Sequence, residues 1–174
     1  MNKLFPHINL NFERIFKCKI QDINDRKIAE FNYKVFNNIL PCGKNLKLWG
    51  KLANDTCDVC NDIQDIYHLL YECSYNLPLW NKISHVIGKR VTGKLVFCGN
   101  GRLTEDHFIS LITYWIYKDW LLKSIDGQKR TSRETIYFLI KEINWYKAVY
   151  LLTKHKDLAD YFDLLKTKLT IYSY

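Results

Sequence analysis

The sequence predicts a mainly α-helical protein, and two observations support this fold class. Apolar residues recur at intervals of three and four along most of the 174 residues, which is the spacing that places side chains on one face of a helix. Hydrophobic residues make up 48% of the chain, enough to bury a core at this length. We therefore expect a helical domain with a small CCHC zinc knuckle inserted into it.

Helices are predicted on both sides of a group of cysteines. The first runs from Asn9 to Lys19, and a longer one runs from about Asp22 or Asn24 to Leu40. Pro41 and Gly43 are expected to end the longer helix. Residues 45–50 then lead to the cysteines, and residues 77–87 are helical again. These elements form a predicted first region, residues 1–88, whose knuckle spans residues 57–73.

A second helical region, residues 89–174, is expected to pack on the first. Four of the seven glycines fall within residues 88–101, so we expect an irregular segment or a short β-hairpin around 89–101. Helices are predicted from Glu105 to about Ser124, from Ser132 to about Lys154, and from Leu158 to Ile171. The link over residues 126–131 is polar and basic.

Four residues combine the atoms and the spacing of a metal site. Cys57, Cys60, His68 and Cys73 form a C-x2-C-x7-H-x4-C string. Three thiolates and one imidazole can complete a closed zinc tetrahedron, which leaves no open position for water or substrate. We therefore predict one structural Zn²⁺ and no catalytic metal.

A short helix is expected to bring His68 and Cys73 back to the cysteine turn. Asn61 and Asp62 are candidate N-caps for it, and Asp65 follows Asp62 at capping-box distance. Two alternatives are a redox Cys-x-x-Cys pair and four unrelated buried side chains, but a redox motif belongs in an α/β pattern that this sequence lacks. His85 could compete with His68, although it lies beyond Pro78 on a separate predicted helix.

The remaining cysteines bear on the cellular compartment. Residues 1–7 show neither the apolar run nor the cleavage site of a secretory signal, so we expect an intracellular protein of the nucleus or cytoplasm, not a secreted one. Cys18, Cys42 and Cys98 are then expected as small buried hydrophobes. The longest apolar stretch, residues 108–117, is too short to span a membrane.

The net charge of +8 is unevenly distributed along the chain. Residues 57–88 carry one Lys and four Asp or Glu, whereas residues 1–56 carry ten basic against five acidic residues and residues 89–133 nine against four. If the protein contacts RNA or DNA phosphates, the cations should lie on the flanks of the metal site. A solvated surface of lysines is the alternative. The candidate nucleic-acid contacts are Lys44, Lys47, Lys51, Lys89, Arg90, Lys129, Arg130 and Arg133.

Catalytic motifs are not recognisable. The glycine pairs lack the other positions of a dinucleotide or phosphate-binding loop, and the remaining histidines have no acidic partner at an informative spacing. We expect no enzyme activity and no small-molecule substrate.

The stretches around the cysteines carry a family resemblance. Residues 31–41 read FNYKVFNNILP, residues 46–50 read LKLWG, and residues 68–73 read HLLYEC, with Leu79-Trp80 after them. In this order they resemble the zinc-binding region at the C-terminal end of the reverse transcriptases of non-LTR (LINE-type) retrotransposons. The resemblance covers residues 10–90 closely and the segment around residues 95–115 more loosely.

The resemblance implies a role in holding RNA or DNA, with Cys57, Cys60, His68 and Cys73 as zinc ligands. The paired carboxylates of the family's polymerase are missing, because this sequence contains no adjacent Asp-Asp. The chain is thus expected to be a detached, non-catalytic C-terminal piece of such a polyprotein, with an upstream reverse transcriptase domain as a candidate partner. Two alternatives stay open: a protein-interaction or scaffolding module that docks on a polymerase domain, and a truncated remnant without a selected function.

Overall fold

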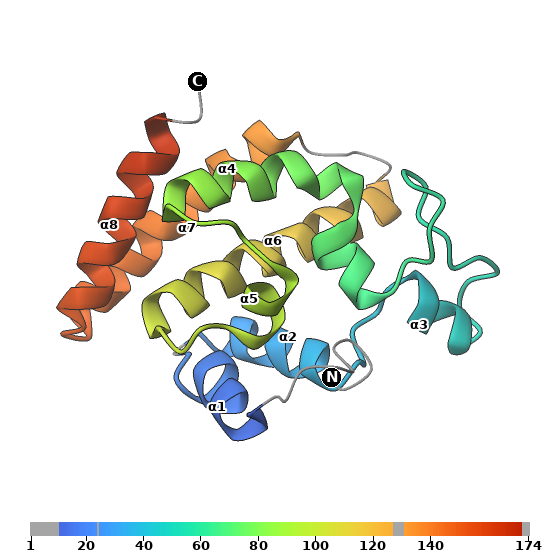
Figure 1. Cartoon of the computed structure of the whole chain (residues 1–174), viewed down its shortest axis with the longest axis horizontal. Coiled ribbons are helices and arrows are strands. Elements are labelled where there is room, and N and C mark those ends of the chain that lie inside the picture. The colour runs from blue at the N-terminus through green and yellow to red at the C-terminus, as the bar shows by residue number, and fades with distance from the viewer. Residues whose placement is uncertain (1–10, 24, 127–130, 172–174) are drawn as a thin grey trace. The chain divides into compact units, whose positions relative to one another are not determined.

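The computed structural model describes residues 11–23, 25–126 and 131–171 and confirms the mainly α-helical class (Figure 1). Within these residues there is no β-strand, and one isolated antiparallel bridge joins Thr56 to Ile63. The helices are α1 (Phe12–Phe16), α2 (Arg26–Phe36), α3 (Gly43–Leu48), α4 (Leu77–Ile87), α5 (Gly93–Cys98), α6 (Leu103–Asp126), α7 (Ser132–Leu152) and α8 (Lys156–Ile171), with π-helical turns at Lys17–Gln21 and His68–Glu72 and a 3₁₀ turn at Ser74–Asn76.

Two compact units divide the chain differently from the regions 1–88 and 89–174. The first contains the chain up to Leu77 together with Thr92–Tyr114, and the second contains Pro78–Val91 together with the chain from Trp115 onward. Helix α4 belongs to the second unit, where Lys168 on α8 donates a hydrogen bond of 3.1 Å to the carbonyl of Val86. The long helix α6 contributes to both units.

Helix α2 is shorter than its apolar pattern predicts. The Asp25 side chain caps it by accepting from the amides of Lys27 and Ile28 at 2.7 and 3.2 Å. The helix ends at Phe36, and Asn38 takes a left-handed conformation with φ of 57°. Asparagine tolerates this conformation, so the chain turns before Pro41. Gly43, which was expected to end the helix, instead begins α3.

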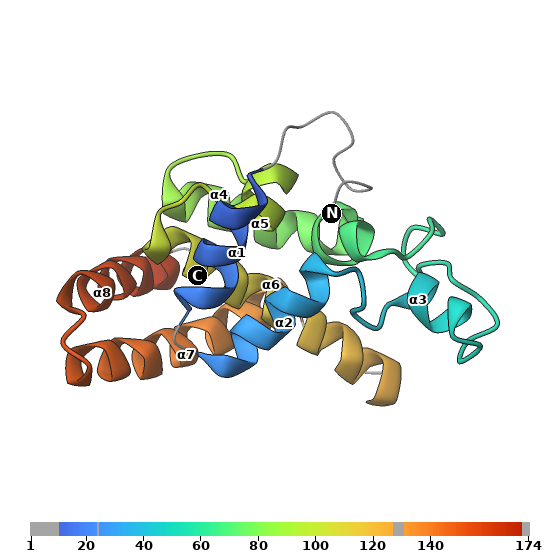
Figure 2. The same ribbon diagram turned by 90° about the horizontal axis from the view of Figure 1, so that it is seen from below.

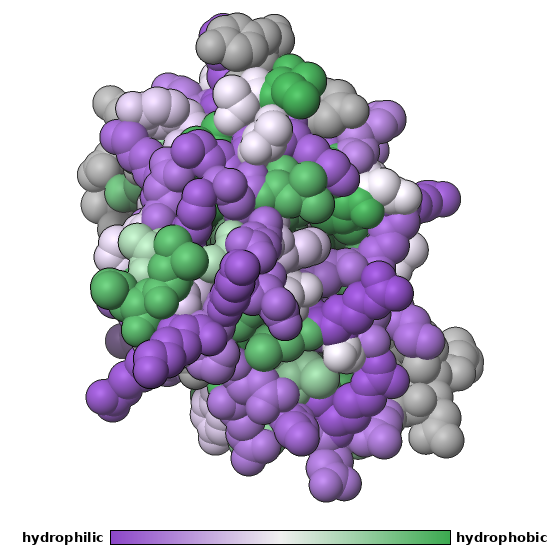
Figure 3. Space-filling view, turned by 90° about the vertical axis from the view of Figure 1, so that its left-hand side faces the viewer, coloured by the Kyte–Doolittle hydropathy of each residue, from purple (hydrophilic) through white to green (hydrophobic). Residues whose placement is uncertain are grey.

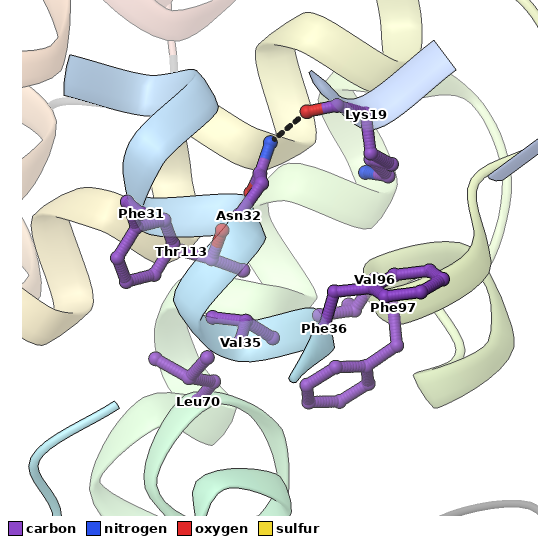
Figure 4. A pocket seen from close by; sticks show the side chains of 9 residues that line it. All are labelled: Lys19, Phe31, Asn32, Val35, Phe36, Leu70, Val96, Phe97 and Thr113. Carbon is purple, nitrogen blue, oxygen red and sulfur yellow. Dashed lines mark hydrogen bonds between the residues drawn. The ribbon is translucent and has the colours of Figure 1, made fainter. Parts of the chain in front are cut away.

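A buried lysine holds together parts of the first unit that are far apart in sequence. The Lys19 ammonium donates to the carbonyl of Asp106 and to the hydroxyl of Ser110, both at 3.2 Å, and burial lowers its pKa. Asn32 donates to the Lys19 carbonyl at 2.6 Å. Figure 4 shows Lys19 and Asn32 beside Phe31, Val35 and other apolar side chains, around a cavity of about 10 Å³. That volume holds about one water molecule, which is too little for a substrate.

The glycine-rich segment is not a β-hairpin, because residues 93–98 form helix α5. The Thr92 hydroxyl accepts from the Leu95 amide at 3.3 Å and so caps the helix, and Gly99 ends it with φ of 67° and ψ of −175°. The segment is irregular on either side of α5, as the alternative prediction had it. The loop after α5 is held by Asp106, whose carboxylate accepts from the amides of Asn100 and Gly101, both at 2.9 Å.

The predicted C-terminal helices form the second unit, and Figure 2 shows α7 and α8 lying side by side. Thr131 and Glu134 make a capping box at the start of α7. The helices pack through aromatic rings: the Phe162 ring centroid lies 6.0 Å from that of Tyr146 and 5.7 Å from that of Tyr150. An ion pair of 2.7 Å joins Lys147 to Asp163 at the edge of this contact.

One face of the molecule shows how hydrophobic and hydrophilic residues are distributed. On the face drawn in Figure 3, green hydrophobic residues alternate with purple hydrophilic ones. In the described part of the chain, no helix has both the length and the apolar character needed to span a membrane.

We predict that Gly99→Ala destabilises the fold more than Gly88→Ala does. Both glycines have positive φ, 67° and 71°. A methyl group at Gly88 meets open space, so that variant should cost about 1–2 kcal/mol for the backbone conformation alone. At Gly99 the methyl group would lie 2.6 Å from the Asp106 carboxylate, which is buried and accepts hydrogen bonds from two loop amides. We therefore expect Gly99→Ala to lower the free energy of unfolding by at least about 2 kcal/mol more than Gly88→Ala does. Urea unfolding of both variants measures the difference, and equal losses would contradict this account of the loop.

Candidate metal centre

Cys57 and Cys60 lie on a tight turn that its own backbone closes. The Cys57 amide donates to the carbonyl of Asp62 at 2.8 Å, and the Asn61 amide donates to the carbonyl of Cys57 at 2.9 Å. Asn61 has φ of 60°, a conformation that asparagine tolerates. The bridge between Thr56 and Ile63 fixes the base of the turn. Both cysteine side chains therefore leave the same short loop.

The other two ligands come from one helical segment that begins at Ile66. Asp65 caps it, because its carboxylate accepts from the His68 amide at 2.9 Å. Asn61 and Asp62, the expected caps, lie in the turn instead. The Cys73 amide donates to the His68 carbonyl at 2.9 Å, which is the wide i→i+5 closure of a π-helix. This closure brings Cys73 back beside His68, while Ile66, Leu69 and Leu70 anchor the segment in the core.

The four side chains converge as the sequence predicts, and their ligand atoms all lie within 4.8 Å of one another. The Cys73 sulfur is 3.8 Å from that of Cys57 and 3.7 Å from that of Cys60. Tetrahedral Zn–S bonds of about 2.3 Å would place two sulfurs about 3.8 Å apart. All six cysteines are unbridged. The cluster can therefore hold a metal ion with little movement of these sulfurs.

The His68 ring supports metal binding more specifically than the sulfurs do. Sulfurs at these separations can also make S–H···S contacts without a metal. Among the residues that the structure describes, Nε2 of His68 has no hydrogen-bond partner, although the side chain is only 5% exposed. Leaving a buried polar atom unsatisfied costs about 1–3 kcal/mol. A metal–nitrogen bond would remove that cost.

The thiols of Cys60 and Cys73 have different environments. Burial raises the pKa of Cys73 to about 12, whereas a hydrogen bond from the Ser74 hydroxyl lowers the pKa of Cys60. The Cys60 sulfur and the Ser74 oxygen are 3.2 Å apart. Because the thiolate is the form that binds metal, an ion in the cluster takes the place of the thiol protons. Ser74 can also stabilise the most exposed sulfur once it is charged.

Gln64 links the cluster to α3 and was not singled out from the sequence. Its side-chain oxygen accepts from the Gly43 amide at 3.2 Å, and its carbonyl accepts from the Lys44 amide at 3.0 Å. Its own amide donates to the Asp55 carbonyl at 2.7 Å. Gln64 and Asp65 are both polar and lie between Ile63 and Ile66, so nothing in the sequence singles out Gln64. Ser74 follows the last cysteine directly, and nothing in the sequence marked it.

The competing residues lie outside the cluster. His85 is on α4 in the second unit. Cys42 and Cys98 are buried, as expected, whereas Cys18 is half-buried and so departs from that expectation.

The predicted nucleic-acid contacts fall in both units. Lys44, Lys47 and Lys51 belong to the first unit and are exposed. Lys47 lies 2.7 Å from Asp55, and Lys44 lies 4.0 Å from Asp65. Exposed pairs of this kind contribute little and can exchange for phosphate. The exposed residues Lys89, Arg90 and Arg133 belong to the second unit, and Lys129 and Arg130 lie outside the described residues.

Comparison with known proteins adds no assignment: no protein-family model matches the sequence, no curated protein matches it, and no solved structure matches the fold. The cluster geometry is therefore the firmest observation on which a function can be built.

We predict that Cys73→Ala loses bound metal and that Cys98→Ala keeps it. The two cysteines are matched in burial, at 6% and 8% exposed, but only Cys73 belongs to the cluster. Native mass spectrometry of protein purified without chelator should show one metal ion per chain in the wild type and in Cys98→Ala, with elemental analysis to identify it. Equal metal content in the two variants would remove Cys73 from the site.

Proposed function

We propose that the protein is a zinc-stabilised accessory module that binds nucleic acid. The observation that carries the proposal is the convergence of three sulfurs and one imidazole on a single point. This donor set suits Zn²⁺ better than Mg²⁺ or Ca²⁺, which prefer oxygen ligands. Four protein ligands fill a tetrahedral zinc, so the ion has a structural role and the segment 57–73 acts as a CCHC knuckle.

The distribution of charge supports nucleic acid as the partner. Residues 57–88 carry an excess of acidic side chains, and the excess of lysine and arginine lies before and after them. Lys51, Arg90 and Arg133 are exposed and can meet phosphate groups. In this proposal the metal holds the fold, and the flanking cations bind RNA or DNA.

The resemblance to the C-terminal region of non-LTR retrotransposon reverse transcriptases supports the same proposal. It implies a part of such a polyprotein that works beside a reverse transcriptase domain, and we propose the nucleus or cytoplasm as its compartment. Six unbridged cysteines suit a reducing compartment. The chain has no adjacent Asp-Asp to hold catalytic magnesium, so we propose that it has no polymerase activity of its own.

A second candidate function is docking on another protein, and one observation favours it. Leu48, Trp49 and Leu52 are 74%, 47% and 46% exposed, at the end of α3 and just after it. Exposed apolar side chains that follow one another closely are typical of a protein interface. In this alternative the module contacts an upstream polymerase domain through α3, and its positive charge is incidental.

We predict that short single-stranded RNA or DNA binds with a salt dependence set by the flanking cations. Replacing Lys51, Arg90 and Arg133 together by Gln should lower the slope of log affinity against log salt by about 2, since each single-strand phosphate contact contributes about 0.7. Replacing the exposed Lys17, Lys27 and Lys156 removes the same charge and serves as the control.

Fluorescence anisotropy measures the affinity of both variants between 50 and 200 mM salt. Over this range, a few phosphate contacts change the affinity by about one decade. Equal salt slopes for the two triple variants would show that nucleic acid is attracted by the net charge of the protein alone. If the wild type retains its metal but binds no nucleic acid at low salt, docking on a protein through α3 becomes the better supported function. Leu48→Ser should then weaken capture of a polymerase domain.

We also predict that the purified protein neither extends a primer nor nicks DNA with Mg²⁺ or Mn²⁺ supplied, because paired carboxylates are missing from its sequence. Gel assays of labelled primer–template and supercoiled plasmid test this. Activity that co-elutes with the folded protein and survives repeated chromatography would overturn the non-catalytic assignment.

A further inference from the structure

Helix α7 exposes two aromatic rings that the fold does not use. Tyr137 is 56% exposed and Trp145 is 55% exposed, the highest values for any aromatic side chain in the described part of the chain. The opposite side of the helix is buried, with Ile136, Leu139 and Ile143 fully covered. Two exposed rings on one helix face can serve as contacts for a ligand, and their surroundings decide which kind of ligand fits.

Both rings are held in place from one side. Tyr137 meets Phe138 edge to face, with centroids 5.8 Å apart and planes at 75°. Trp145 meets Tyr146 in the same way, at 5.0 Å and 81°. Phe138 in turn stacks on Trp115 of α6 at 5.6 Å, and Tyr146 is buried. Each exposed ring is thus supported at one edge while about half of its surface stays open to a ligand.

The residues between and beside the rings are charged or polar on the exposed side of the helix. The Lys141 ammonium lies 4.6 Å from the centre of the Tyr137 ring, in a cation–π contact. Arg133 lies one turn before Tyr137, and Asn144 lies next to Trp145, and both are exposed. The acidic side chain at this end of the helix, Glu134, accepts hydrogen bonds from the amide and hydroxyl of Thr131. Glu142 also lies between the rings and is half-buried. The exposed cations Arg133 and Lys141 give this face two groups that can contact the anionic parts of a ligand.

The spacing of the rings fits a chain of stacked bases. Tyr137 and Trp145 are eight residues apart, which is about 12 Å along a helix. Nucleotides in a duplex strand rise about 3.4 Å each, and an unstacked strand is longer per nucleotide, so two to four nucleotides span this distance. Lys141 lies between the rings, where it can meet a phosphate of the same segment.

We propose that the Arg133–Trp145 face of α7 binds single-stranded nucleic acid by stacking bases on Tyr137 and Trp145 while Arg133 and Lys141 contact its phosphates. The inference deepens the proposed function and rests on it. A duplex is disfavoured because its bases already stack on one another and their faces are closed to protein rings. A protein partner is disfavoured because lysine is depleted from the centre of protein interfaces, and Lys141 occupies the centre of this one.

The test compares Tyr137→Ala/Trp145→Ala with Tyr33→Ala/Trp49→Ala. The control pair removes one tyrosine and one tryptophan of similar exposure, 46% and 47%, from the first unit. The probes are a fluorescein-labelled ten-nucleotide oligo(dT) or oligo(U) and a hairpin duplex of the same length. Each stacking ring contributes about 1–3 kcal/mol, so the α7 pair should weaken single-strand binding at least about 25-fold, and the control pair less than about threefold.

Two conservative variants separate stacking from folding. Trp145→Phe should keep most of the affinity but lower the quenching of tryptophan fluorescence on binding, because it removes one of the five tryptophans, the one at the proposed stacking site. Lys141→Gln should lower the salt slope by about 0.7, whereas the aromatic variants should leave the slope unchanged. Metal content and far-UV circular dichroism should match the wild type in every variant.

The outcomes distinguish this inference from the proposed function. If the wild type binds oligonucleotide and the α7 pair binds equally well, the stacking site is wrong and nucleic-acid binding stands. If a metal-loaded wild type binds no oligonucleotide, both are overturned. Light scattering that shows a dimer in the wild type and a monomer in the α7 pair, with unchanged oligonucleotide affinity, would make this face a contact between two copies and overturn the inference.

Discussion

The packing of three sulfurs and one imidazole nitrogen within 4.8 Å constrains the structure between α3 and α4. The segment 49–65 contains no helix and has a single β-bridge, and Leu52, Val59 and Ile63 point into solvent. Ordinary hydrophobic burial therefore contributes little there. Structural zinc contributes about 10–16 kcal/mol of apparent binding free energy in small peptides, so the zinc that we propose would be enough to order such a loop. Gln64 joins the first turn of α3 to the segment that carries Cys57 and Cys60, so α3 would share that stabilisation.

The sequence predicted most of the helices because their apolar faces are regular. The bounds of α4, α7 and α8 fall within about two residues of the expected ones, since each has a periodic apolar face and α7 also begins at a capping box. The end of α2 could not be predicted in the same way. Its apolar pattern continues to Leu40, but the left-handed conformation of Asn38 stops the helix earlier, and that choice depends on the side chain of Asn45. Of the two forms expected around 89–101, the β-hairpin is not found, because Thr92 caps a short helix whose residues are almost all buried, and the segment is irregular on either side of that helix.

The four residues of the cluster were predictable because cysteine and histidine at such spacing have few other uses. The residues that support them were not, because their roles depend on three-dimensional neighbours. Ser74 acts on Cys60 across 3.2 Å, and the π-helical closure that returns Cys73 to His68 has no recognisable sequence pattern. The rings of Tyr137 and Trp145 escaped notice for a related reason. Along the sequence they read as part of the apolar content of α7, and only the packing of Ile136, Leu139 and Ile143 on the other side shows that they face outward.

The distribution of charge indicates that a metal and a phosphate would bind at different parts of the chain. One Zn²⁺ held by three thiolates and a neutral imidazole carries a net charge of about −1, so metal binding does not make the knuckle cationic. Asp58, Asp62, Asp65 and Glu72 add further negative charge around it. A phosphate near the ion would be repelled, and Lys44 and Lys47 partly neutralise acids of this same loop. The cations that remain available include Lys51 before the knuckle and Arg133 and Lys141 on α7, where they alternate with exposed aromatic rings. In the proposed function the metal stabilises the fold, and a separate helix face that carries cations and aromatic rings binds the ligand.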